Sequence, residues 1–210
     1  MNNSIRIAAP AKLNLHLDIR EKRSDGFHEL SSLFVMISMY DTLTVKKNNR
    51  QGCVIQGCSQ IPLKKNLIWL AYQKYCQSAG RMCGLEVECK KEIPEMAGLG
   101  GGSSDAAAML RVLRLLHPVD IGADEILRIA TELGSDVPFF LYSPSALVEG
   151  RGERIYPIET PVAWDCVIIK PDFDISTGEA YRILDAEHRT KNKLLSGKDI
   201  HELYQKGPRH

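Results

Sequence analysis

Pro94-Glu-Met-Ala-Gly-Leu-Gly-Gly-Gly-Ser-Ser104 is the stretch of sequence around which the chain is organised. Glycine occupies four of the five positions from 98 to 102, and a glycine backbone reaches conformations that other residues avoid. Apolar residues recur at helical spacing directly after it, and Ser103, Ser104 and Asp105 are residue types that cap helix starts. The pattern predicts a glycine loop that opens a helix.

Such a loop is suited to bind phosphate. Its backbone N–H groups and the positive end of the helix dipole converge on one spot, where serine hydroxyls add hydrogen bonds to phosphate or Mg²⁺. A simple tight turn would need one or two glycines rather than four. The residues predicted to line this phosphate site are Pro94, Glu95, Met96, Ala97, Gly98, Leu99, Gly100, Gly101, Gly102, Ser103 and Ser104, with Lys91 just before the loop.

Two common nucleotide-binding motifs are absent from the sequence. There is no G-x-x-x-x-G-K-[ST] segment, and Gly98-Leu-Gly100 is not completed to G-x-G-x-x-G because Ser103 stands at the last position. The sequence therefore favours neither a P-loop NTPase nor a dinucleotide-binding fold.

The rest of the chain mixes helical and strand periods. Alternating polar and apolar residues predict a strand over residues 12–19, with Lys12 and Asn14 on its polar face. Further strands are expected over residues 31–40, 42–47 and 85–90, and helices over 67–75 and 126–133. Gly134 is the expected C-cap residue of the last helix, which places Asp136 in the turn that follows. This mixture predicts an α+β fold, with a domain boundary near Tyr156.

Composition limits the classes of partner. The 27 Lys and Arg nearly balance the 26 Asp and Glu, so nucleic-acid and membrane-surface binding are not expected. No cleavable leader and no run of ~20 apolar residues is present, which predicts a soluble, cytoplasmic protein. The six cysteines lack metal-site spacing and are expected to be free thiols, several of them buried as small hydrophobic residues. No protein metal-ligand set is predicted.

A family resemblance enters at this point. Pro94 to Ala107 resembles the P-x-x-x-G-L-G-[GS]-G-S-S-x-A-A loop of the GHMP kinase superfamily. The resemblance implies a GHMP kinase N-terminal domain (ribosomal protein S5 domain 2-like) over residues 1–155. It also implies the start of an incomplete ferredoxin-like C-terminal domain over residues 156–210. ATP and Mg²⁺ are the implied cofactors.

Two further regions narrow the resemblance to one branch of the superfamily. They are Ala9-Pro-Ala-Lys-Leu-Asn-Leu-His-Leu17 with Arg23-Ser-Asp-Gly-Phe-His-Glu-Leu30, and Leu133-Gly-Ser-Asp-Val-Pro-Phe139. Kinases of this branch phosphorylate the C2 hydroxyl of 4-diphosphocytidyl-2-C-methyl-D-erythritol in the non-mevalonate isoprenoid pathway. The resemblance therefore implies a small-molecule substrate with a cytidine diphosphate head.

The resemblance also implies roles for individual residues. Asp136 is the expected general base on the acceptor hydroxyl, and Lys12 polarises that hydroxyl and keeps Asp136 ionised. Phe27 is expected to stack on cytosine and His28 to hydrogen-bond its edge. The remaining implied substrate contacts are Asn14 and Tyr181. Tyr181 fits a short amphipathic helix equally well.

The sequence departs from the family pattern at its C-terminal end. The Asn-Asp-[FL] and T-G-[ST]-G segments of these kinases are absent, so a truncated chain with a weakened substrate cleft and poor turnover is expected. The alternatives are another GHMP small-molecule kinase and a non-catalytic nucleotide-binding module. RNA binding is disfavoured by the balanced charge. The oligomeric state is left open by the sequence.

Overall fold

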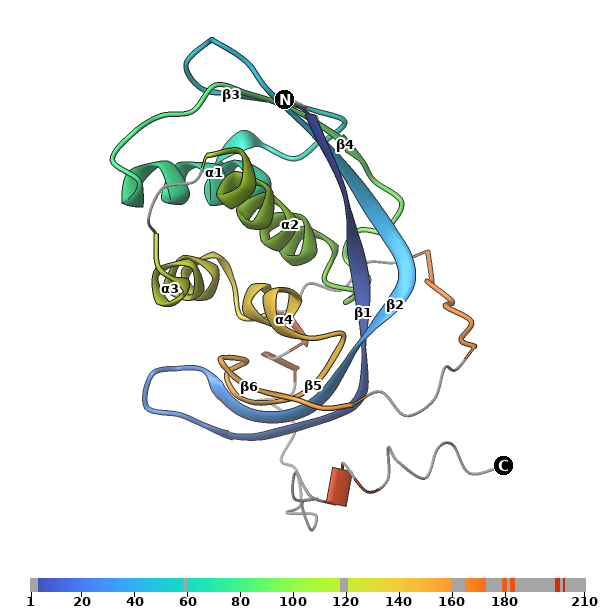
Figure 1. Ribbon diagram of the computed structural model, residues 1–210. Helices are drawn as coiled ribbons and strands as arrows, with labels where there is room; N and C mark the ends of the chain where they lie inside the picture. The colour runs from blue at the N-terminus through green and yellow to red at the C-terminus, as the bar shows by residue number, and fades with distance from the viewer. Residues whose placement is uncertain are drawn as a thin grey trace.

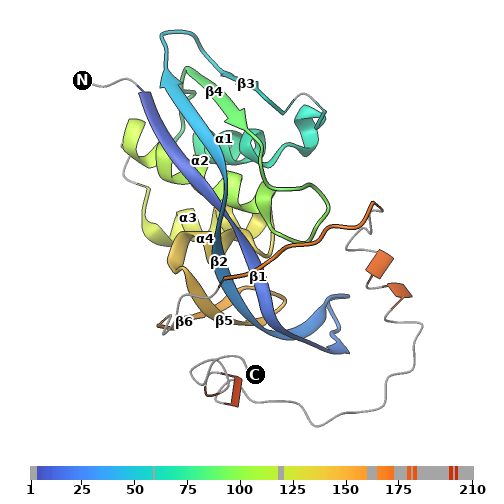
Figure 2. The ribbon, with the colours of Figure 1, turned by 90° about the vertical axis from the view of Figure 1, so that its right-hand side faces the viewer.

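The computed structural model describes residues 4–58, 60–117, 121–159 and 165–172, with residues 179–180, 182–183, 199–200 and 202 beyond them. Helices cover one face of a curved mixed sheet (Figures 1 and 2). In chain order the elements are β1 (Ser4–Lys22), β2 (His28–Lys47), β3 (Cys53–Gln56), the 3₁₀ helix η1 (Leu63–Lys65), α1 (Leu67–Ser78), β4 (Leu85–Lys90), α2 (Gly101–Leu116), α3 (Ala123–Leu133), α4 (Val137–Tyr142), β5 (Ser145–Gly150) and β6 (Arg154–Pro157).

β2 is the strand that holds the sheet together. It pairs antiparallel with β1 along most of its length, with β5 in its first half and with β4 in its second half. β3 runs parallel to β4, and β6 runs antiparallel to β5. The two strands expected over residues 31–40 and 42–47 are thus one continuous strand, and Asp41 lies buried inside it.

The strand predicted over residues 12–19 forms as part of β1, but the polar side chain of Lys12 faces the helices. Lys12 is buried, whereas Leu15 and Leu17 on the apolar face are 39% and 48% exposed. β1 has irregular register near Lys12, Asn14 and the end of the strand, and such bulges bend and twist a strand. The strand therefore presents polar groups to the interior of the molecule.

α2 is the central helix of the core. Its residues Ala106 to Leu110 are all buried, and it contacts α1, α4 and β1. Its N-cap is Gly100, in the left-handed region at φ 71°, and no side chain caps the helix. The expectation that Ser103, Ser104 and Asp105 supply the cap is therefore wrong. They lie inside the first turns, because the glycine loop ends earlier than the residue types indicated.

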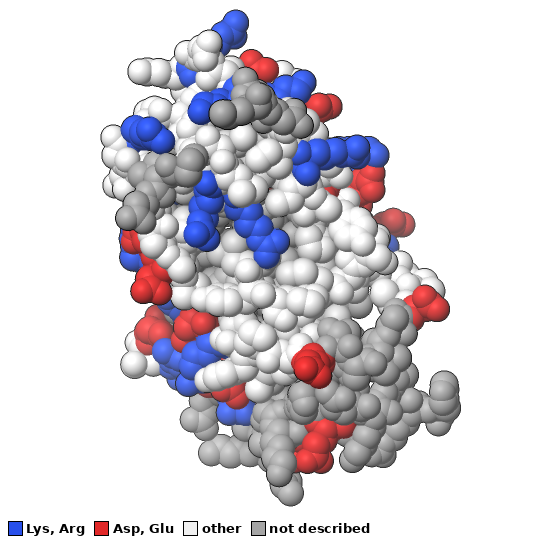
Figure 3. Space-filling model, viewed as in Figure 1, with Lys and Arg blue, Asp and Glu red and all other residues white. Residues whose placement is uncertain are grey.

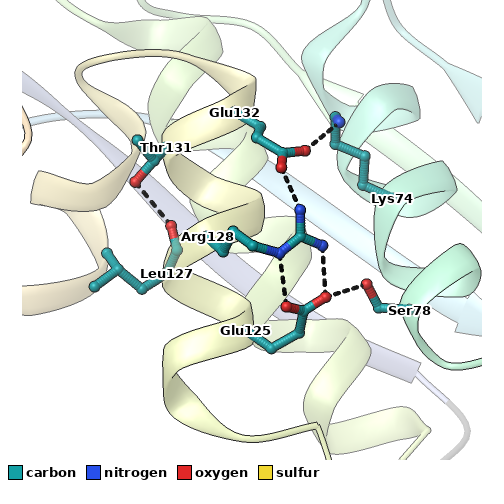
Figure 4. Close-up of polar contacts among 7 residues, drawn as sticks. All are labelled: Lys74, Ser78, Glu125, Leu127, Arg128, Thr131 and Glu132. Atoms are coloured by element: carbon teal, nitrogen blue, oxygen red, sulfur yellow. Dashed lines mark hydrogen bonds and ion pairs between the residues drawn. The ribbon is translucent and has the colours of Figure 1, made fainter.

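α1 and α3 are joined at the surface by a network of polar contacts (Figure 4). The Arg128 guanidinium pairs with Glu125 at 2.6 Å and with Glu132, and Glu132 also pairs with Lys74 at 2.6 Å. Hydrogen bonds from Arg128 and Ser78 lower the pKa of Glu125 to about 2. Exposed pairs of this kind contribute little individually, so the network mainly orients α3 against α1.

The predicted α+β class is confirmed, as helices and strands both build the core. All six cysteines are free, as expected, and four of them are buried. On the face shown in Figure 3, acidic and basic side chains are interspersed around a broad central area that carries neither. Within the described part of the chain, no helix is both long and apolar enough to cross a membrane.

The predicted boundary near Tyr156 stays a prediction. Among the described residues after position 160, Ile168 packs against the cluster of Ala11, Ile93 and Leu99, and Ile200 packs against Leu33. Most residues of the expected ferredoxin-like domain lie outside those that the structure describes.

Candidate active site

The Lys12 ammonium and the Asp136 carboxylate lie together at the inner face of β1. Lys12 Nζ is 3.6 Å from Asp136 Oδ2 and donates a hydrogen bond of 2.5 Å to Asn14 Oδ1. It also lies 4.6 Å from the centre of the Phe34 ring. The Asn14 amide is itself fixed by a 3.0 Å bond to Ser32 Oγ. These partners hold the ammonium in one place, facing the carboxylate.

Asp136 reaches this position from the turn between α3 and α4. Gly134 ends α3, as predicted, and Asp136 occupies the N-cap position of α4. Its side chain accepts no capping hydrogen bond, and about a third of it is exposed. The carboxylate is therefore available to a ligand while Lys12, which is 7% exposed, stays behind it.

The glycine loop is fastened to β1 at Lys12. The backbone N–H of Lys12 donates to the Leu99 carbonyl at 2.9 Å, and the Leu99 side chain is buried. A methyl group added at Gly100 would lie 3.1 Å from Lys12 Cγ and 3.0 Å from Phe140 Cζ. Glycine at this position lets the loop lie directly on the stem of Lys12.

The loop backbone adopts the conformations that an anion site needs. Met96, Gly98 and Gly100 have φ of 53°, 71° and 71°. The first helical hydrogen bond runs from Ser104 N to the Gly100 carbonyl, so the amides before it have no acceptor within the helix. Ser104 Oγ is buried without a partner at the same helix start. This arrangement offers donors to phosphate oxygens beside Asp136.

A buried ionic cluster lies next to the glycine loop. The Lys91 ammonium pairs with Asp41 and, at 2.8 Å, with Asp105, while Asp41 Oδ1 accepts the backbone N–H groups of Glu92 and Ile93. Burial opposes the charge of Lys91, but Asp105 and Asp41 outweigh it and raise its pKa. The predicted nucleotide contact of Lys91 stays a prediction, since its ammonium is held by two carboxylates.

Burial raises the pKa of Asp105 to about 6, against the opposing pull of Lys91, whereas the unfolded value is near 3.8. Stability from this group is therefore complete below pH 3.8 and lost as the pH rises through 6. We expect Asp105→Asn to gain stability relative to the unmodified chain between pH 4 and pH 7, by up to about 3 kcal/mol. Urea unfolding of both proteins at the two pH values measures this difference.

The matched control is Asp124→Asn, at an exposed residue in the first turn of α3. A stability difference between Asp105→Asn and the unmodified chain that does not change with pH would contradict a buried Asp105 with a raised pKa.

Sequence reasoning did not predict the buried ionic roles of Asp41 and Asp105. The one available signal was a carboxylate at position 41, between the two stretches predicted as strands.

Phe27 and His28 lie at the far end of the β1–β2 hairpin. Phe27 is 49% exposed, and its backbone N–H donates to Asp25 Oδ1 at 3.1 Å. The Arg151 guanidinium lies 5.1 Å from the centre of its ring. The structure thus brings Lys12, Asn14, Asp136 and the loop into one site and places Phe27 and His28 apart from it. Tyr181 lies outside the described residues.

Comparison with known proteins agrees with this arrangement. Residues 66–144 match the model of the GHMP kinases N terminal domain. A 4-diphosphocytidyl-2-C-methyl-D-erythritol kinase of Thermotoga maritima is 40% identical over 207 residues, which are 99% of this chain and 69% of the relative. The chain belongs to the 4-diphosphocytidyl-2-C-methyl-D-erythritol kinase family. The resemblance drawn from the loop, the β1 segment and the Asp136 segment is thereby confirmed.

Solved structures of a 4-diphosphocytidyl-2-C-methyl-D-erythritol kinase and of a more distant protein share the fold of this chain. A crystal structure of 4-(cytidine 5'-diphospho)-2C-methyl-D-erythritol kinase is 41% identical, with a TM-score of 0.67 over 75% of this chain. The match spans 56% of that solved chain. A homoserine kinase from Cytophaga hutchinsonii shares the fold at 19% identity, with a TM-score of 0.60 over 87% of this chain and 60% of its own.

Proposed function

We propose that the protein transfers a phosphoryl group from ATP to the C2 hydroxyl of 4-diphosphocytidyl-2-C-methyl-D-erythritol, a step of the non-mevalonate isoprenoid pathway. The observation that carries this proposal is the Lys12–Asp136 pair, 3.6 Å apart, beside the glycine loop. Family membership supports the choice of reaction, and the pair supplies groups for the transfer.

Asp136 acts as the general base in this proposal. Phosphoryl transfer needs an alcohol oxygen aligned with the γ-phosphate and an acceptor for its proton. The partly exposed carboxylate of Asp136 accepts that proton, and the Lys12 ammonium stabilises both the carboxylate and the forming alkoxide. Asn14 fixes the ammonium and offers its amide to the sugar alcohol. The loop amides hold the transferring phosphates.

Mg²⁺ belongs to the proposal as the partner of ATP. The described residues contain no group of three or more His, Cys, Asp or Glu side chains that could hold a metal ion. Mg²⁺ commonly keeps several waters and binds substrate phosphates with few protein ligands, which fits this loop. The Ser103 and Ser104 hydroxyls are the side chains that would meet it, since Ser104 Oγ has no hydrogen-bond partner among the residues that the structure describes. When bound, the ion neutralises charge on the phosphates.

The cytidine head is assigned to the hairpin end. Phe27 stacks on the base and His28 hydrogen-bonds its edge, with Tyr181 proposed for the opposite face. The half-exposed ring of Phe27 supports this placement, because a stacking platform must be open to its ligand.

A coupled assay of ADP release tests the function. We expect release with ATP and 4-diphosphocytidyl-2-C-methyl-D-erythritol, and none above background with homoserine or galactose. Thermal-shift measurements with cytidine diphosphate are run beside it, because a ligand of the folded state raises the melting temperature. Stabilisation without ADP release would favour a nucleotide-binding module. Release with homoserine alone would favour another kinase of the superfamily.

A further inference from the structure

The turn between β5 and β6 is built to hold Arg151 in a fixed position. Gly150 and Gly152, on either side of Arg151, have φ of 77° and 120°, which a residue with a side chain rarely adopts. The backbone N–H of Arg151 donates to Glu153 Oε2 at 2.7 Å. The side chain of Arg151 therefore leaves a defined backbone, and it points to the hairpin end.

Arg151 differs from its basic neighbours in its partners. Arg23 is held by Asp25 at 3.1 Å and Glu29 at 2.7 Å, and Arg154 is paired with Glu29. Within the described part of the chain, the Arg151 guanidinium forms no ion pair at contact distance, although it acts electrostatically on the Asp25 carboxylate, and it is stacked 5.1 Å from the Phe27 ring centre. Its N–H donors are thus available along the edge of the guanidinium.

The other side of the same turn touches the segment that carries Asp136. A methyl group added at Gly152 would lie 2.9 Å from Ser135 Cβ and 3.0 Å from the Ser135 carbonyl oxygen. In Figure 1, β5 and β6 lie between α4 and the end of the β1–β2 hairpin. The turn therefore contacts both the Phe27 ring, which is proposed to stack on cytosine, and the segment that carries the Asp136 carboxylate.

The order of chemical groups along the proposed substrate matches this arrangement of residues. In a cytidine diphosphate ester the two phosphates lie between the base and the sugar alcohol. Arg151 stacks on Phe27, and the next residue, Gly152, touches Ser135 in the Asp136 segment. A guanidinium presents donors in a planar fork that matches phosphate oxygens, and it stacks on aromatic rings at the same time. The position and the chemistry of Arg151 both fit an anion with two phosphates.

We propose that Arg151 binds the diphosphate of the acceptor substrate while its guanidinium face supports the Phe27 ring. This inference rests on the proposed function, because it takes the cytidine head to lie at Phe27. It adds a substrate-binding residue that belongs to neither the glycine loop nor the Lys12–Asp136 pair. The substrate class that it selects is a nucleoside diphosphate ester rather than a nucleoside.

The test compares cytidine 5'-diphosphate with cytidine as ligands, using calorimetric or NMR titration. We expect Arg151→Ala to weaken cytidine 5'-diphosphate binding by about 10-fold or more, the usual effect of losing a charge-assisted phosphate contact. Cytidine binding should change by less than about twofold, since cytidine has no phosphate. Arg151→Lys, which keeps the charge but not the fork, should lie between these extremes.

Arg154→Ala is the matched control, because it removes the same charge from a guanidinium that is already paired with Glu29. It should leave both affinities near those of the unmodified chain. Equal losses for cytidine and its diphosphate in Arg151→Ala would overturn the diphosphate contact and leave only support of Phe27. Unchanged binding would also overturn it. Failure of the unmodified chain to bind cytidine 5'-diphosphate would instead refute the proposed function, and the Arg151 assignment with it.

Discussion

Asp136→Asn is expected to lower the rate of phosphoryl transfer by at least about 100-fold while ATP affinity stays within about twofold. The amide keeps the shape of the carboxylate but cannot take the proton of the acceptor hydroxyl at neutral pH. ATP binding should persist, because the loop is fastened to β1 by the Lys12–Leu99 backbone hydrogen bond and not by Asp136. ADP release and nucleotide titration measure the two properties separately.

Two further variants sharpen this experiment. Lys12→Ala should also lose most of its turnover while keeping the loop in place, because the backbone N–H that bonds Leu99 is unchanged. Asp124→Asn, at an exposed position on α3, serves as the control and should keep the normal rate. Near-normal turnover of Asp136→Asn would rule out Asp136 as the general base.

Lys91→Met is expected to destabilise the folded chain by about 3–5 kcal/mol. The change removes the ammonium shared by Asp41 and Asp105, which are both almost fully buried. Two carboxylates would then face each other without a compensating charge. The loss should be smaller at pH 5 than at pH 8, because protonation of Asp105 removes one of the two charges. Urea unfolding at both pH values measures the effect.

Lys90→Met is the matched control, since Lys90 is the adjacent lysine but is 73% exposed and, among the described residues, pairs only with Glu92. Its stability should change little, because exposed ion pairs contribute little. Equal stability of the Lys90 and Lys91 variants would show that the buried cluster does not stabilise the fold. Loss of stability without loss of nucleotide binding would separate the cluster from the loop that it supports.

The sequence predicted correctly those elements that depend on residues close to one another in the chain. The glycine loop, the helix after it and the C-cap at Gly134 follow from residues close in sequence, and the structure confirms all three. The helix expected from residue 67 also forms, with Asn66 accepting hydrogen bonds from the backbone of Ile68 and Trp69. In each case the deciding groups lie within a few residues of one another.

Long-range contacts explain what the sequence did not show. The continuity of β2 through Asp41 depends on Lys91, which is 50 residues away and makes the buried charge tolerable. The polar groups on the inner side of β1 depend likewise on Asp136 and Ser32. Arg151 carries no motif of its own, and its position over Phe27 is visible only in three dimensions. Such residues are found from contacts, not from periodicity.

The hydrogen bond between the Lys12 backbone and Leu99 anchors the glycine loop through main-chain atoms rather than side chains. In the proposed function the phosphate donor is therefore held by backbone atoms, which every substitution at Lys12 except proline retains. In the same proposal the acceptor is bound by side chains of the hairpin and the Asp136 turn, which mutation can replace one at a time. Under this proposal, substitutions on the acceptor side would change the alcohol that is phosphorylated without disturbing the loop.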